Sequence, residues 1–347
     1  VVEPDQVLAR LDRRTLEATK AQAEAALASA EAQVAAAEAT VVQAKAQQTL
    51  TVQELTRAQQ LLAKGHSSQE GTDVRVSERD VAAAMSETDL VPSEAVTVVL
   101  SERGLARAAK GHEIEPAALS YKQGDGFLAA AKGRSNQQSI FVDSNGRAYT
   151  LQTHTLPSAR GQGDPLTGRF KPADGASFKG VIAGDPEMWW LVASDSGYGF
   201  FVTPGELYSR AKAGKAMLRV PEGGTALTPV TVDDTEFPED TLVAAVGSAG
   251  HLLVFPSEEL PEMARGKGNK MLGVPPKKYK AGEERMVSMA LLQQGQNLIV
   301  HCGERKMTVK ASEVLDRYLG ERGRRGSLLP RNYRKVDRIE PEPLPRE

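Results

Sequence analysis

Between residues 95 and 309 the sequence repeats one pattern five times: a short apolar stretch, a tight polar turn and a second apolar stretch. The turns fall at Gly104, Gly146, Gly197, Gly250 and Glu304, at intervals of 42, 51, 53 and 54 residues. A period near 50 built from hairpins is typical of blades arranged around a central axis. The alternative, an irregular β-sandwich, would not explain why the intervals cluster. We therefore expect a mainly β fold with five propeller-like blades.

A second repeat follows the hairpins. About 14 to 18 residues after each of the last four turns comes a loop of small and basic residues: SARGQGDP, SRAKAGKAM, EMARGKGNKM and GERGRRGS. In these loops Arg160, Lys212, Arg265 and Arg322 recur at intervals of 52, 53 and 57. The first hairpin offers only YKQGDG, with Lys122, as a weak counterpart. If the blades are related by rotation, the loops lie at equivalent places on one rim.

The loop EMARGKGNKM has some features of a nucleotide-binding turn, but its spacing excludes that reading. A P-loop needs four residues between its glycines and a Ser or Thr after its Lys, whereas Gly266 and Gly268 are two apart and Met follows Lys270. The interval from Gly268 to Gly273 is also wrong for a dinucleotide fingerprint. As one of a series of cationic points on a curved edge, the loop instead favours a polyanion, whose phosphates each cation would neutralise.

The first part of the chain has a helical pattern that differs from the β-rich part. Over residues 15–65 two heptad series, one starting at Leu16 and one at Leu27, alternate by four and three residues, with alanine at many positions. This pattern predicts one long helix with a coiled-coil seam. At this length a surface helix of a globular domain is the weaker interpretation. We assign residues 1–73 to the helical coiled-coil segment and residues 74–92 to a linker.

This helical segment resembles the ascending helix of the hairpin in periplasmic adaptor (membrane fusion) proteins. The family's hairpin tip carries an Arg, a Leu and a Ser, which match Arg57, Leu61 and Ser68 in RAQQLLAKGHSSQE. The resemblance implies docking to an outer-membrane channel and, for this segment alone, a periplasmic location. Only about ten helical residues follow before Pro92, so the descending helix is missing and the seam must self-associate, find a partner or fray.

The β-rich part resembles the C-terminal domain of the A subunit of bacterial topoisomerase IV, a relative of the gyrase A C-terminal domain. The resemblance extends from about residue 88 to 340 and includes FVDSNGRAYTLQTHTLPSARGQGDPLTG and LPEMARGKGNKMLGVP. It implies a five-bladed β-pinwheel over residues 93–340, followed by a tail at 341–347. It also implies binding and bending of duplex DNA, partnership with the topoisomerase IV catalytic core and the B subunit, and a cytoplasmic, nucleoid-associated location. The gyrase wrapping motif has only a degenerate counterpart, GERGRRG at 320–326.

The resemblance places candidate DNA contacts in the matching loops. For each single residue an ordinary solvated surface charge is an equally good interpretation, so the set is better supported than its members. Phosphate contacts position DNA without reading its sequence, and no segment resembles a recognition helix. The first candidates are Arg160, Arg265, Lys267, Lys270, Arg322, Arg324 and Arg325; Lys110, Lys132, Arg134, Arg169, Lys212 and Lys215 are second candidates.

The sequence gives little support for catalysis. The five histidines lack metal-ligand spacing, and one cysteine, Cys302, excludes an internal disulfide framework and a multi-cysteine zinc site. We expect no metal, no cofactor and no enzymatic activity, and no apolar run is long enough to span a membrane. The two resemblances imply different compartments. We interpret the chain as a fusion with its seam between Glu70 and Asp89, and the competing functions are a DNA-binding accessory domain and an envelope adaptor fragment.

Overall fold

The computed structural model describes residues 92–231, 240–293 and 295–343. The chain divides into two units, residues 1–84 and 85–347, and the β-rich fold belongs to the second. The expected coiled-coil helix, the adaptor-like tip at Arg57, Leu61 and Ser68 and the proposed seam lie outside the described residues. Within the described ranges, no helix has the length and apolarity needed to cross a membrane.

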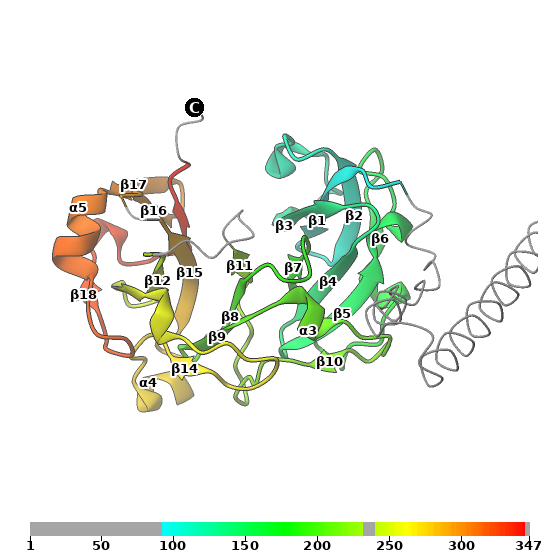
Figure 1. Cartoon of the computed structure of the whole chain (residues 1–347). Coiled ribbons are helices and arrows are strands. Elements are labelled where there is room, and N and C mark those ends of the chain that lie inside the picture. Colours follow the sequence, from blue (N-terminus) through cyan, green and yellow to red (C-terminus); the bar gives the residue numbers. More distant parts are fainter. Residues whose placement is uncertain (1–91, 232–239, 294, 344–347) are drawn as a thin grey trace, which may run out of the picture. The chain divides into compact units, whose positions relative to one another are not determined.

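Five antiparallel sheets form the second unit, and each is centred on one hairpin (Figure 1). The structure therefore confirms the five blades that the hairpin spacing predicts. The paired strands are β1 (Ala95–Ser101) and β2 (Leu105–Lys110), β4 (Gln138–Asp143) and β5 (Arg147–Gln152), β8 (Trp190–Ser194) and β9 (Tyr198–Val202), β12 (Leu242–Gly247) and β13 (His251–Pro256), and β16 (Leu298–Cys302) and β17 (Arg305–Val309).

The first strands of the first four hairpins are buried on both faces. In β4 and β12 every residue after the first is buried, which is why they read as continuous apolar runs rather than as an alternating pattern. Four of the hairpins close with a three-residue turn whose last residue is a glycine with φ between 75° and 82°. Glycine adopts this left-handed conformation without a steric penalty, so the spacing of the turns is visible in the sequence.

An inner strand follows each hairpin in the chain. Consecutive inner strands contact one another from the first blade to the second and from the third to the fifth, and Gly180 of the second meets Pro229 just before the third. The inner edges of all five blades therefore form one succession. The inner strands are β3 (Phe127–Arg134), β7 (Phe178–Ile182), β11 (Val230–Thr231), β15 (Met286–Leu292) and β19 (Arg338–Pro341).

The outer strand of each of the first four blades comes from a later part of the chain. After the hairpin of one blade, the backbone returns to the outer edge of the preceding blade and pairs there over two residues. The fifth sheet has three strands within the described residues. The exchanged outer strands are β6 (Asp164–Pro165), β10 (Lys215–Ala216), β14 (Asn269–Lys270) and β18 (Ser327–Leu328).

Buried side chains connect successive blades, and short helices link the strands. One apolar cluster spans the first three blades, a second the third and fourth, and a third the fourth and fifth, so the core is continuous from blade to blade. The connecting helical turns are η2 (Pro116–Ala118), η3 (Thr153–Thr155), η4 (Leu166–Gly168), α3 (Pro204–Leu207), η5 (Ser257–Glu259), α4 (Pro276–Lys280), α5 (Ala311–Glu313), η6 (Val314–Tyr318) and η7 (Arg331–Tyr333).

All four exchanged strands share one register. In each case the residue that follows a loop glycine pairs with the second residue after the hairpin glycine of the preceding blade. The loop glycines have φ between 73° and 88°, and a Cβ on Gly268 would lie 2.1 Å from the carbonyl oxygen of Gly199. These glycines therefore allow the returning chain to approach the edge of its neighbour. The pairs are Asp164↔Ala106, Lys215↔Ala148, Asn269↔Gly199 and Ser327↔Leu252.

We expect Gly268→Ala to destabilise the fold well beyond the cost of its backbone conformation. Gly175 is the matched control, because it has φ of 76° but a Cβ added there would meet open space. Gly175→Ala should lower the free energy of unfolding by roughly 1–2 kcal/mol, the cost of a left-handed alanine. Gly268→Ala should lower it by about 2 kcal/mol more, because it also overpacks the strand edge. Equal losses in urea unfolding would contradict the tight exchange.

Candidate nucleic-acid interface

The four basic loops of the sequence coincide with the strand exchanges. We call residues 158–165, 209–216, 262–270 and 320–328 the crossovers. The first and third begin at a parallel bridge to the preceding blade's outer hairpin strand, as Glu262 does with Phe201, and the fourth directly follows such a bridge at Leu319. All four end in the exchanged strand. The basic residues lie before the exchanged strand, except Lys215 and Lys270, which lie in it. The equivalence that the loop spacing predicts is therefore a feature of the backbone.

Two arginines of the hairpins hold the crossovers in place. The guanidinium of Arg107, which is 2% exposed, donates to the carbonyl of Gly161 at 2.7 Å. Arg147 donates to the carbonyls of Ala213 and Gly214, each at 2.7 Å. The guanidinium groups of these arginines donate to backbone carbonyls. They therefore stabilise the first two crossovers rather than present a charge to solvent.

Five cations on the first three crossovers face solvent. Arg160, Arg210, Lys212, Arg265 and Lys267 are exposed. Across residues 92–231, 240–293 and 295–343, no carboxylate forms an ion pair with any of them. Each of these crossovers therefore carries at least one uncompensated positive charge at the outer edge of a blade.

The fourth crossover carries three arginines, but each has an acidic partner. Arg322 lies 3.5 Å from a carboxylate oxygen of Glu259 and donates to the carbonyl of Lys270 at 2.8 Å. Arg324 pairs with Glu321 at 2.9 Å. Arg325 pairs at 2.8 Å with a buried glutamate. These three first candidates therefore contribute less free charge than their number in the sequence indicates.

Among the second candidates, Lys110, Arg169 and Lys215 also have partners. Lys110 lies 3.3 Å from Glu94, and Arg169 lies 3.2 Å from Asp164. Lys215 is half-buried in an exchanged strand, and its ammonium donates to the carbonyl of Glu206 at 2.5 Å. Of the second candidates, Lys212 alone is an exposed crossover cation without an ion pair to any described carboxylate.

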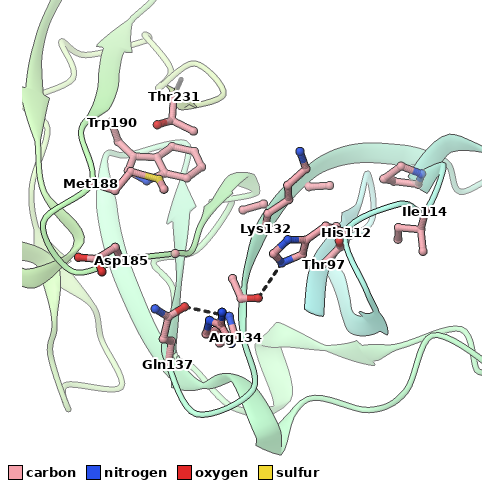
Figure 2. A pocket seen from close by; sticks show the side chains of 15 residues that line it. Thr97, His112, Ile114, Lys132, Arg134, Gln137, Asp185, Met188, Trp190 and Thr231 are labelled. Atoms are coloured by element: carbon pink, nitrogen blue, oxygen red, sulfur yellow. Dashed lines mark hydrogen bonds between the residues drawn. The ribbon is translucent and has the colours of Figure 1, made fainter. Parts of the chain in front are cut away.

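Lys132 and Arg134 lie elsewhere in the blade. Both belong to β3, the inner strand of the first blade, and not to a crossover. Both are exposed, and they line a separate recess together with Trp190 (Figure 2). The structure therefore does not bring these two candidates together with the outer cations.

A recess of about 520 Å³ gathers the largest group of cations on the outer side of the third blade. Lys267 and Lys270 enter it from the third crossover, Lys280 from α4, and Arg285 from the segment before β15. The one acidic lining residue is Glu222. We call this site the lysine recess. Cations from three separate segments thus line one hollow, which concentrates positive potential there and favours anionic groups such as phosphates.

Two tyrosine rings support cations of the lysine recess. The ammonium of Lys267 lies 3.7 Å from the centre of the Tyr198 ring, and the guanidinium carbon of Arg285 lies 5.0 Å from that of Tyr279. Such pairs hold a cation in place while leaving its outer side open to a ligand.

Buried Asp195 anchors the tyrosine and arginine on one side of the recess. It accepts hydrogen bonds from Tyr279 at 2.7 Å and from Arg285 at 2.5 Å. Burial and the Asp195 carboxylate raise the pKa of the Tyr279 phenol, and the same carboxylate raises the pKa of Arg285. Because Asp195 compensates Arg285, the lysines supply most of the positive charge of this site.

Sequence reasoning missed Lys280, Arg285 and the two tyrosines of the recess. They come from a short helix, an inner-strand approach and a hairpin strand, which share no spacing in the chain. The basic run PKKYK of α4, directly after the third crossover, is the one signal that pointed to this region.

A charged cluster lies beneath the fourth crossover. Glu284, which is 4% exposed, accepts from Arg325 at 2.8 Å and lies 3.6 Å from Lys278. The Nε2 atom of His251 lies 3.1 Å from the donating Nε of Arg325. Burial, followed by the charge of Arg325, lowers the pKa of His251 below its ordinary value. At neutral pH His251 is therefore neutral, and its Nε2 atom accepts the hydrogen bond from Arg325.

Comparison with known proteins finds relatives of one kind. No family model matches the chain. It is 49% identical over 261 residues to the A subunit of DNA topoisomerase 4 from Pseudomonas aeruginosa, covering 75% of this chain and 34% of the relative. It is 43% identical over 263 residues to the same protein of Escherichia coli K12, covering 76% of this chain and 34% of the relative. The chain thus spans about a third of the length of these curated relatives.

Solved structures locate the match. The E. coli ParC C-terminal domain is 42% identical with a TM-score of 0.61, and the match covers 72% of this chain and 99% of that structure. A second structure, of the C-terminal domain of DNA topoisomerase IV, is 16% identical and has a TM-score of 0.56. At that identity the second structure supports the fold alone.

The neutral state of His251 predicts a loss of stability in mild acid. The folded pKa lies below the unfolded value of 6.5, so the unfolded chain binds more protons as the pH falls through 6.5. The free energy of unfolding should therefore fall between pH 7 and pH 5, and His251→Gln should remove part of that fall. His154→Gln, at an exposed position, is the control. The contradicting result from urea unfolding is an identical pH dependence for wild type and His251→Gln.

Proposed function

The chain belongs to the ParC C-terminal domain family, and we propose that residues 93–340 bind and bend duplex DNA as an accessory domain of a type II topoisomerase. One observation carries the proposal: the first three crossovers, at equivalent edges of successive blades, each present uncompensated cations. A duplex that follows these edges meets a positive charge at each blade in turn. Each contact neutralises a phosphate and releases counterions.

The contacts we propose involve the backbone of DNA rather than its bases. Exposed arginines and lysines on short loops reach phosphates, and the described blades contain no long helix that would enter a major groove. Any sequence preference would come from how easily the duplex bends. The outer edges belong to blades arranged around one succession of inner strands, so a duplex that contacts several of them curves.

The lysine recess is the strongest single contact in this proposal. It combines Lys267 and Lys270 of the third crossover with Lys280, and the Tyr198 ring holds the Lys267 ammonium at the recess. Arg160 and Lys212 extend the contact to the preceding blades. The fourth crossover contributes less, because Arg322, Arg324 and Arg325 are ion-paired.

In the parent enzyme, this domain would present DNA to a catalytic core. The relatives are components of DNA topoisomerase 4, and the chain matches about a third of their length, in the part that corresponds to the ParC C-terminal domain. We therefore propose that its partners are the strand-cutting region and the B subunit, that no cofactor binds here, and that the protein acts at the nucleoid in the cytoplasm. Self-association through the N-terminal heptads stays a prediction.

The first test is the salt dependence of duplex binding. For Arg265→Ala/Lys267→Ala, the slope of log affinity against log salt should become shallower by about 2, because two phosphate contacts are lost. Lys306→Ala/Lys310→Ala is a control with the same charge change at exposed positions outside the crossovers and α4. Fluorescence anisotropy with a labelled duplex measures both. An unchanged slope for the crossover variant, or the same change in both variants, would remove the third crossover from the interface.

The ion pairs of the fourth crossover predict a ranking of single substitutions. Arg265 has no described carboxylate partner and can contact a phosphate directly, whereas the Arg324 guanidinium is paired with Glu321 and must leave it to make such a contact. Arg265→Ala should therefore weaken duplex binding more than Arg324→Ala at low salt, where phosphate contacts contribute most. The opposite order would show that Arg324 leaves its glutamate to bind DNA.

A further inference from the structure

A second recess, of about 500 Å³, lies on the inner side of the first blade. It is lined by β3, by the segment from Gly184 to Trp190 that leads into β8, and by Thr231 of β11 (Figure 2). We call it the inner recess. None of its lining residues belongs to a crossover, so the proposed duplex contacts leave it unassigned.

Two cations of one strand line the polar side of the inner recess. In a strand, alternate residues share a face, so Lys132 and Arg134 of β3 lie on one side. His112 adds an imidazole, whose Nε2 lies 3.0 Å from the carbonyl of Gly133. Asp185 is the one acid among the fifteen lining residues, and one of its oxygens already accepts the backbone N–H of Glu187 at 2.9 Å.

The other side is apolar and includes an aromatic ring. Trp190 and Met188 line it (Figure 2). Trp190 is 3% exposed, and its buried indole Nε1–H meets no acceptor among the described residues. An unpaired buried donor costs free energy, which an acceptor brought into contact with it would recover. The recess thus combines cations, an apolar wall and an unused donor at a size typical of small-molecule sites.

We propose that the inner recess binds a nucleotide. The phosphate would lie between Lys132 and Arg134, and the flat base would contact the wall of Met188 and Trp190. A bare phosphate ion would leave the apolar wall without a partner, whereas a nucleotide uses both sides. Asp185 and Gln137 add polar groups that suit the exocyclic atoms of a base. The same chemistry is offered by a free mononucleotide and by an unpaired base of single-stranded DNA.

Tryptophan fluorescence tests this site directly, because the chain has two tryptophans. In a Trp189→Phe background, dAMP should quench Trp190 emission saturably, and inorganic phosphate at the same concentrations should not. Lys132→Ala/Arg134→Ala should weaken dAMP binding about tenfold or more, the usual effect of losing charged hydrogen bonds. Lys306→Ala, exposed on β17, should bind dAMP like the background protein.

Further arms separate the sources and the two sites. Quenching by dAMP and by a short single-stranded oligonucleotide, but not by a duplex, identifies unpaired DNA as the ligand; quenching by dAMP alone identifies a free nucleotide. Arg265→Ala/Lys267→Ala should leave dAMP affinity unchanged, since the lysine recess is a different site. The proposal is overturned if neither dAMP nor the oligonucleotide quenches, or if Lys132→Ala/Arg134→Ala binds dAMP normally while its melting temperature shows a folded protein.

Discussion

The exchange of a two-residue outer strand between neighbouring blades is the interaction on which the rest of the molecule depends. Each exchange connects one blade to the next, and all four exchanges have the same register. Glycines make it possible, because a Cβ at Gly268 or Gly326 would meet the backbone of the neighbouring strand. The same loops carry the basic residues, so the interaction that holds the blades in order also sets where the positive charges stand.

Local features of the sequence predicted the hairpins of the blades. They did not predict the exchanged outer strands, because these pair with distant parts of the chain. Hairpin turns depend on a few adjacent residues such as Ser144, Asn145 and Gly146, so their spacing gave the correct number of blades. The outer strands are two residues long and have no apolar pattern of their own. Their partners lie about 60 to 75 residues earlier in the chain, so no local sequence pattern predicted this pairing.

The sequence indicated where the basic loops lie in the fold, but not how much of their charge is free. The crossovers stand where the loop spacing indicates, yet the arginines of GERGRRG pair with Glu259, Glu284 and Glu321, and two of these partners are 41 or more residues away in the sequence. Counting cations in a loop therefore overestimates its free charge. The lysine recess shows the converse, because it collects cations from segments that look unrelated in the sequence. The structure also places the candidate cations on two different surfaces, the crossovers and the inner recess, which the sequence does not distinguish.

The central claim, that cations on successive crossovers curve a duplex, is tested most directly by energy transfer between dyes at the two ends of a DNA fragment. A duplex of about 40 base pairs is well below the persistence length and is nearly straight when free. At saturating protein, energy transfer should rise, and it should rise less with Arg160→Ala/Lys212→Ala, which removes one exposed cation from each of the first two crossovers. Saturated binding with no change in energy transfer would contradict the account.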